Sequence, residues 1–151
     1  FYLSHDFMGK RSNSGCLFMD RDTEEGDFNR VIYGHNMGTG SDAMFSVLLQ
    51  FEDAEYFNEN SVMFYTDRYE NMAAYEVIAV VKYNVDDVGE WDFRVRNHGN
   101  KKECLAWMAQ LKERAFLYRE PEVFPESLIT LATCDRRVYG KDGRFLIIGG
   151  K

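Results

Sequence analysis

The residues of this sequence whose chemistry stands out are His35, Cys134 and Arg144. A cysteine sulfur can attack a carbonyl carbon, and an imidazole can protonate the departing amine and then accept a proton from the incoming nucleophile. A guanidinium, helped by backbone N–H groups near the cysteine, can hydrogen-bond the substrate backbone or a developing oxyanion. Together they would catalyse acyl transfer as a Cys–His pair with an arginine, without the carboxylate of the usual triad.

Each of these three side chains also has an ordinary structural explanation. A cysteine in an apolar strand is most often a small buried hydrophobic residue. A histidine in a glycine-rich turn is usually solvated, and an arginine at the start of a strand is usually a surface charge. The sequence alone does not place His35 beside Cys134, because the two residues are far apart in the chain.

Two short apolar runs are expected to position Cys134 and Arg144. Residues 127–134 form a β-branched run typical of a buried strand, with the cysteine at its end. Charged, turn-like residues follow at 135–143, and a second apolar run occupies residues 144–148. Strands with so short a connection are expected to pair in the antiparallel direction, which would make Cys134 and Arg144 neighbours. A guanidinium beside a thiol favours the ionised form of the thiol.

The rest of the chain is expected to alternate short strands with helices. Ser41 is the expected N-cap of a buried helix over residues 43–51. Asn100 is the expected cap of an amphipathic helix over residues 101–118. The other expected elements are strands at residues 15–19, 30–34, 61–66 and 73–83 and a short helix at 53–60. This order favours a mainly β fold, an antiparallel barrel-like domain with helical insertions, including one long helix before the strand of Cys134.

The composition limits the classes of function. A length of 151 residues suggests one domain, 1–151, with a substantial core. The chain is 45% hydrophobic and 15% aromatic, which is typical of a globular protein. Its formal net charge of −7 argues against a face that binds nucleic acid. No apolar run approaches the roughly 18 residues that are needed to span a bilayer.

The cysteines are few and odd in number: Cys16, Cys104 and Cys134. Such a set does not form a disulfide framework. No two of them have CxxC spacing, so a thiolate metal site is not expected. At least one thiol must be free, and Cys134 has the surroundings that best suit a nucleophile.

Three separate motifs resemble those of the sortase family and occur in the same order. Residues 130–134, TLATC, resemble the TLxTC signature, in which the nucleophile comes last. Arg144 follows where sortases place their catalytic arginine, and residues 33–37, YGHNM, resemble the histidine segment of class B sortases. Residues 15–20, the helix containing Met44 and Phe45, and the later long helix also resemble that class. By this resemblance the chain is identified as a class B sortase over nearly its whole length.

The resemblance implies an activity and its partners. Sortases are extracellular, membrane-anchored cysteine transpeptidases of Gram-positive bacteria. They cut a C-terminal sorting motif after its Thr, form a thioacyl-enzyme, and transfer the protein to an amine of a cell-wall precursor. The implied catalytic residues are His35, Cys134 and Arg144, with no metal or other cofactor. The implied partners are a surface protein that carries the sorting motif and a lipid-linked peptidoglycan precursor.

The resemblance also suggests substrate-contacting residues and a longer protein. Ala132, Thr133 and Asp135 are expected to contact substrate. Ala132 occupies a variable position that some class B members fill with Ser, so a hydroxyl contact is missing there. The alternative for Asp135 is a solvated acid in a turn. The implied fold is an eight-stranded β-barrel, and we expect an N-terminal anchor and the first strand or strands to precede Phe1.

Two other classes of function compete with a transpeptidase. The first is a hydrolytic cysteine peptidase, in which water resolves the acyl-enzyme. The second is a catalytically silent β-barrel that only binds peptides or a partner protein. Ligation of the cut peptide to an added amine would distinguish a transpeptidase from the hydrolytic peptidase. An acyl adduct on Cys134 would exclude the catalytically silent β-barrel.

Overall fold

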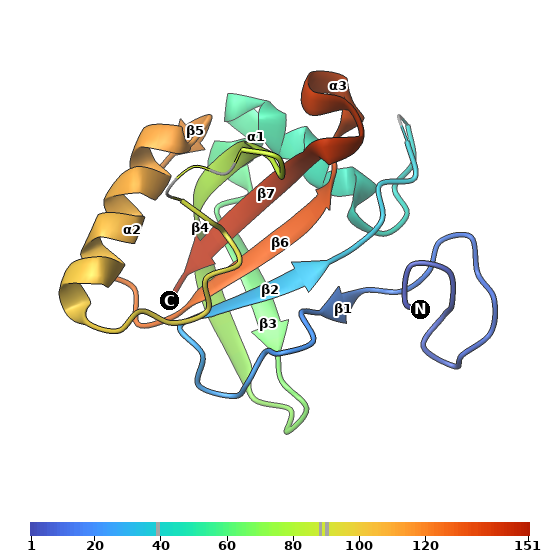
Figure 1. Ribbon diagram of the computed structural model, residues 1–151, viewed down its shortest axis with the longest axis horizontal. Coiled ribbons are helices and arrows are strands. Elements are labelled where there is room, and N and C mark those ends of the chain that lie inside the picture. The colour runs from blue at the N-terminus through green and yellow to red at the C-terminus, as the bar shows by residue number, and fades with distance from the viewer. Residues whose placement is uncertain (39, 88, 90) are drawn as a thin grey trace.

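One curled sheet organises the protein (Figure 1). The computed structural model describes residues 1–38, 40–87, 89 and 91–151. In these ranges seven strands form a single sheet of order β1-β2-β6-β7-β4-β3, with β5 paired to β4. The sheet curls into a half-barrel with helices in its connections, which confirms the predicted mainly β fold class.

The helices and strands are mostly short. In chain order they are β1 (Phe18–Met19), β2 (Asn29–Tyr33), the 3-10 helix η1 (Phe45–Glu52), α1 (Ala54–Glu59), β3 (Val62–Thr66), β4 (Met72–Asn84), α2 (Lys101–Arg114), β5 (Leu117–Tyr118), β6 (Leu128–Cys134), α3 (Arg136–Tyr139), the 3-10 helix η2 (Gly140–Asp142) and β7 (Gly143–Gly150). The connection between β6 and β7, which was expected to be a turn, therefore contains two short helices.

Strand β6 lies between β2 and β7 in the sheet. It pairs with β7 in the antiparallel direction, and Cys134 lies opposite Arg144, as the sequence predicts. It pairs with β2 in the parallel direction, with Tyr33 opposite Ala132, so the sheet is not antiparallel throughout, as the expected antiparallel barrel-like domain would be. A parallel pair needs a long crossover, and the segment from η1 to β5 provides it. The carboxyl ends of β2 and β6 therefore lie at the same edge of the sheet.

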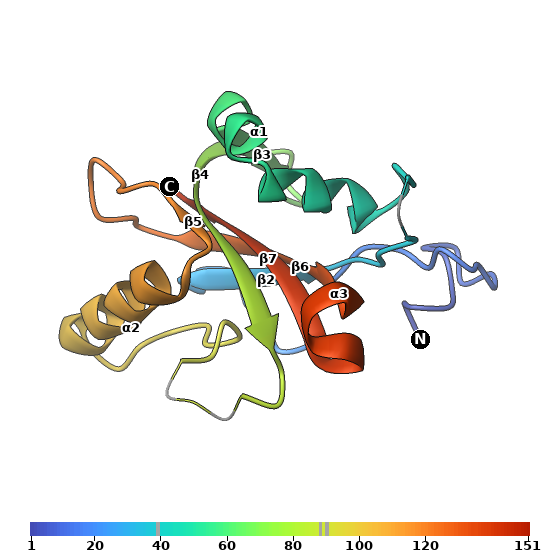
Figure 2. The same ribbon diagram turned by 90° about the horizontal axis from the view of Figure 1, so that it is seen from above.

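Helices cover both faces of the sheet (Figure 2). Side chains alternate along β7, so Leu146 and Ile148 enter one core and Phe145 and Ile147 enter the other. The first core includes residues of α2 and of the segment before it: Trp91, Phe93, Trp107, Met108 and Leu111. The second includes residues of η1 and α1: Phe45, Leu48 and Phe57. The two cores hold β6 and β7 between them and so fix the strand ends that carry the candidate site.

Helix η1 begins later than predicted and is a 3-10 helix. The residue before its first turn is Met44, with a φ of 51°, and not Ser41. The hydroxyl of Ser41 instead accepts a hydrogen bond from the Ala43 amide. The start of the helix is set by a tertiary bond, because the Phe45 amide donates to the carbonyl oxygen of His35 over 2.9 Å.

Helix α2 begins as predicted but ends earlier. The side chain of Asn100 accepts a hydrogen bond from the Glu103 amide over 3.0 Å, and the Glu103 carboxylate accepts one from the Gly99 amide over 2.9 Å. The helix ends at Arg114 and not at Tyr118. The difference arises because residues just beyond the helix form β5 and pair with β4, with Tyr118 opposite Ala79.

Asn29 ties the segment before α2 to the sheet, and its side chain is fully buried. Its Nδ2 donates to the carbonyl oxygens of Phe93 (2.8 Å) and Val95 (3.1 Å), and its Oδ1 accepts from the Thr130 hydroxyl (2.9 Å). We expect Asn29→Ala to lower the free energy of unfolding by about 2–3 kcal/mol, because buried polar groups lose their partners. Denaturant titration measures this loss. The exposed Asn13→Ala is the control. Equal losses of stability in the two variants would show that the buried hydrogen bonds of Asn29 do not stabilise the fold.

Candidate active site

Cys134 and Arg144 face each other across the β6–β7 ladder. Cys134 is the last residue of β6, half-buried and with a free thiol. The Nη1 atom of Arg144 donates hydrogen bonds to the carbonyl oxygens of Lys141 (3.1 Å) and Gly143 (2.8 Å). These bonds hold the guanidinium at the start of β7, next to the strand end that carries the thiol.

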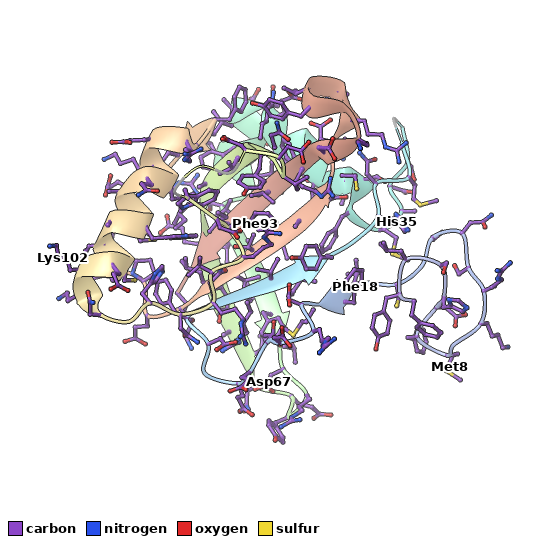
Figure 3. All side chains as sticks on the ribbon, viewed as in Figure 1. Met8, Phe18, His35, Asp67, Phe93 and Lys102 are labelled. Carbon is purple, nitrogen blue, oxygen red and sulfur yellow. The ribbon has the colours of Figure 1, made fainter. Side chains whose placement is uncertain are left out.

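His35 lies two residues beyond the end of β2 and is brought to the same edge of the sheet. The Gly34 amide donates to the carbonyl oxygen of Ala132 over 3.1 Å. On the other side of the histidine, the Nδ2 of Asn36 donates to the carbonyl oxygen of Cys134 over 2.8 Å. The backbone of His35 is therefore linked on both sides to β6, the strand that carries Cys134. Figure 3 shows the labelled His35 on the side of the molecule where β6 ends.

The imidazole of His35 contacts the N-terminal segment. Its Nε2 lies 2.6 Å from the carbonyl oxygen of Leu3. A carbonyl oxygen can only accept a hydrogen bond, so Nε2 carries the proton in this arrangement. The imidazole is thus held by a main-chain oxygen rather than by a carboxylate.

The three residues expected to contact substrate are almost fully buried. Ala132, Thr133 and Asp135 are 1%, 2% and 2% exposed, respectively. The hydroxyl of Thr133 donates to the carbonyl oxygen of Gly34 over 2.8 Å and so strengthens the link between β6 and the histidine loop. Asp135 is not a solvated turn acid. Contact between these residues and a substrate stays a prediction.

Asp135 begins a chain of alternating charges, here called the charge chain, which consists of Asp135, Arg137, Glu52 and Lys82. Arg137 donates to Asp135 through Nε (2.8 Å) and Nη2 (2.9 Å). The same guanidinium donates through Nη1 to Glu52 (2.8 Å), and Glu52 also pairs with Lys82. The charge chain connects the residue after Cys134 to η1 and to β4.

Ion pairing favours the charged forms of Asp135, Glu52 and Arg137. Hydrogen bonding by Arg137 lowers the pKa of Asp135 although burial opposes this. Hydrogen bonding by Lys82, and next by Arg137, lowers the pKa of Glu52. The hydrogen bonds to Asp135 in turn raise the pKa of Arg137. The buried carboxylate of Asp135, beside Cys134, is therefore negative, and its charge is balanced by Arg137.

An aromatic cleft of about 820 Å³ opens beside β1 and β2. In it Phe18 stacks between Tyr2 and Tyr33, with ring centroids 5.5 Å and 5.3 Å apart. Tyr33 precedes His35 by two residues, and Tyr2 precedes the Leu3 carbonyl that holds the imidazole. The cleft therefore lies next to the histidine. Its lining residues are Tyr2, Leu17, Phe18, Met19, Asp20, Arg21 and Tyr33.

The fold and the motifs agree with comparisons to known proteins. Residues 4–151 match the sortase domain family, and the chain belongs to that family. It is 27% identical over 152 residues to sortase B of Listeria monocytogenes, a match that covers 99% of this chain and 59% of the relative. The chain thus spans less than two thirds of that relative's length.

Solved structures of sortase B have the same fold. The X-ray structure of Clostridium perfringens sortase B has a TM-score of 0.86 and 24% identity, and the match covers 99% of this chain and 80% of the other. The complex of Staphylococcus aureus sortase B with a substrate has a TM-score of 0.83 and 20% identity, with 99% of this chain and 67% of the other covered. These structures share the fold of this chain, and together with the sortase-family match and the Listeria monocytogenes sortase B they confirm the prediction of class B.

Some residues of the site were not singled out from the sequence. Asn36 lies within the histidine motif, but nothing in its spacing indicates a bond to Cys134. Arg137 follows Asp135 by two residues, which is a short-range signal for an ion pair at a helix N-terminus. Glu52 is far from both in the chain, so its contact with Arg137 had no sequence signal.

Asn36 is the residue whose loss should disturb the spacing between histidine and thiol most directly. We expect Asn36→Ala to slow acylation of the Cys134 thiol by roughly tenfold, because a small misplacement of reacting groups slows a reaction strongly. The rate of acyl-adduct formation on Cys134 measures the effect, and the exposed Asn13→Ala is the control. Unchanged kinetics in Asn36→Ala would show that its bond to the Cys134 carbonyl does not position the site.

Proposed function

We propose that this chain is a cysteine transpeptidase that joins a surface protein to a cell-wall precursor. Its substrate is a protein with a C-terminal sorting motif, which is cut after Thr, and its second substrate is an amine of a peptidoglycan precursor. The proposal rests above all on one observation within a sortase-family fold. The β6–β7 register sets Cys134 opposite Arg144, and the parallel β2–β6 pair brings the loop of His35 to the same edge.

The proposed reaction has two steps: Cys134 first forms a thioester with the substrate, and the acyl group is then transferred to the acceptor amine. The sulfur of Cys134 attacks the Thr carbonyl carbon, and its proton passes through His35 to the leaving amine as the C–N bond breaks. Arg144 and nearby backbone N–H groups stabilise the oxyanion. The acceptor amine then attacks the thioester and loses a proton to His35. That proton returns to the sulfur as the C–S bond breaks.

Two solved relatives support the choice of substrates. One is a Staphylococcus aureus sortase B in complex with a substrate, and another is a sortase B in complex with triglycine. A triglycine has a free amine of the kind that the second step requires. The aromatic cleft beside β1 and β2 is our candidate for part of the peptide-binding surface, because it lies next to His35.

The proposed site of action is the outer face of the cell membrane of a Gram-positive bacterium. Sortase-family proteins act at the bacterial cell surface, and we propose that this protein is attached there by an N-terminal anchor. Among the helices of the described residues, none is long and apolar enough to cross a bilayer. The N-terminal anchor is therefore proposed separately from the helices and strands described above.

A peptide-library assay with mass detection tests the proposed function. The protein is incubated with sorting-motif peptides, first alone and then with triglycine as acceptor. We expect an acyl adduct on Cys134 and a ligated product that ends in triglycine. Cleavage with no ligation at high triglycine would indicate a hydrolytic peptidase instead. The absence of an adduct with every peptide would indicate a catalytically silent binding domain.

A further inference from the structure

The histidine loop, residues 34–38, is held from two sides. On one side it is bound by β6 through the hydrogen bonds described above. On the other side it is bound by the first two residues of helix η1. The Phe45 amide donates to the carbonyl oxygen of His35 over 2.9 Å, and the Met37 amide donates to the Ser46 hydroxyl over 2.7 Å. The helix therefore fixes the loop at the histidine and again two residues beyond it.

The start of η1 is adapted to this contact. Ser46 is only 5% exposed, and a buried hydroxyl needs a hydrogen-bond partner, which the Met37 amide provides. Met44, directly before the helix, has a φ of 51° and a ψ of −131°, which side chains other than glycine rarely adopt. Its backbone pairs with that of Asn36 in the histidine loop. A strained residue persists only where its surroundings determine its conformation, so the loop and not local propensity sets the helix start.

The last residue of η1, Glu52, binds the segment that follows the thiol. Its carboxylate accepts a hydrogen bond from Nη1 of Arg137 over 2.8 Å. Arg137 in turn donates to Asp135 through Nε (2.8 Å) and Nη2 (2.9 Å), and Asp135 directly follows Cys134. Glu52 also pairs with Lys82 of β4. The end of η1 is therefore fixed both to the sheet and to the loop after the thiol.

The body of η1 packs on the strands that carry the thiol and the guanidinium. Phe45 and Leu48 of the helix share a core with Phe145 and Ile147 of β7. The helix contacts β6 as well as β7. Since this core is closely packed, the helix cannot slide along the sheet without losing these contacts. A single helix thus extends from the histidine loop to the loop after the thiol.

We infer that η1 is a positioning helix that sets the spacing between His35 and Cys134, with Ser46 and Glu52 as positioning residues at its two ends. The inference rests on the proposed function, which assigns the reaction to this histidine and this thiol. The histidine lies beyond the last ladder pair of β2, and the segment after the thiol lies beyond the last ladder pair of β6. Contacts outside the ladders therefore contribute to the positions of both loops, and η1 provides them.

The first test measures the rate of acyl-adduct formation on Cys134 with a saturating sorting-motif peptide. Ser46→Ala and Glu52→Ala should each slow acylation by roughly five- to tenfold, because a small misplacement of reacting groups slows a reaction strongly. The peptide concentration that gives half the maximal rate should not change, since both residues act through the loops and not on the peptide. Gln50→Ala is the matched control, because Gln50 is exposed on the same helix. This variant should react at the normal rate.

The double variant distinguishes one positioning helix from two independent contacts. If both ends act through η1, the loss of either end already releases the spacing. Ser46→Ala combined with Glu52→Ala should then be at most about twofold slower than the slower single variant. Effects that multiply, to roughly 25- to 100-fold, would show that the two contacts act separately and would overturn the inference.

Hydrogen exchange tests the two contacts without reference to activity. Amides of residues 35–38 should exchange faster in Ser46→Ala, and amides of residues 135–139 should exchange faster in Glu52→Ala. Both segments should exchange at the normal rate in Gln50→Ala. If Glu52→Ala does not fold, Glu52→Gln replaces it, because its amide keeps the size of the side chain and removes the charge.

Each outcome has one meaning. Normal acylation in both single variants, or weaker peptide binding in place of slower acylation, would overturn the inference and leave the proposed function standing. A lower melting temperature with normal acylation would show a merely structural role and would also overturn it. If the unmodified protein forms no adduct with any peptide, the proposed function fails. Hydrogen exchange then decides by itself whether η1 holds the two loops.

Discussion

Cys134→Ala should abolish the acyl adduct and lower transpeptidation by roughly 10⁴-fold or more, because removal of a nucleophile removes the covalent pathway itself. The thiol is at the end of β6, so the change deletes one sulfur at a half-buried position and should leave the core intact. Intact-mass spectrometry with a sorting-motif peptide measures the adduct, and chromatography measures the ligated product.

Cys104→Ala is the control for this prediction. Cys104 lies on α2, far from β6 in sequence, and burial raises the pKa of its thiol, which makes it a poor nucleophile at neutral pH. This variant should form the adduct and the product at normal rates. An adduct that persists in Cys134→Ala, or that disappears in Cys104→Ala, would show that the nucleophile has been assigned to the wrong cysteine.

Gly143→Ala is expected to have the largest effect on stability. A Cβ at this position would lie 2.0 Å from the backbone oxygen of Asp135. That oxygen cannot move away, because the adjacent ladder pairs Cys134 with Arg144 and Thr133 with Phe145. The two strands would have to separate at the site, at a cost of about 3–5 kcal/mol in the free energy of unfolding.

The measurements for Gly143→Ala are thermal unfolding and transpeptidation. The melting temperature should fall by roughly 10 °C, and activity should fall as Cys134 and Arg144 move apart. Gly99→Ala is the matched control, since the added Cβ would meet only the carboxylate of Glu103, at 3.1 Å, at the end of a flexible side chain. Similar melting temperatures for the two variants would mean that β6 and β7 do not approach as closely as described.

Local sequence signals predicted the elements whose structure depends on nearby residues. The pairing of Cys134 with Arg144 followed from two apolar runs and a short connection, and the structure confirms it. The start of α2 followed from Asn100 as a cap. In both cases the partners are close in the chain, so their types and spacing carry enough information.

Elements that depend on distant partners were not predictable in the same way. The parallel pairing of β2 with β6 depends on strand order, and nothing in either strand encodes it. The start of η1 depends on a bond between Phe45 and His35, and the end of α2 depends on β5 joining β4. The link between Asp135 and Glu52 through Arg137 combines η1 with the loop after β6, so spacing gave no sign of it.

The central place of β7 has a consequence for the order of folding. This strand comes last in the sequence order of the elements, yet it lies between β6 and β4. A chain that emerges amino end first must hold both neighbours without their shared partner until residues 143–150 become available. The β4–β7 pairing spans a long sequence separation, and such pairings form slowly. The pairing that brings Arg144 opposite Cys134 therefore forms only after β7 is available.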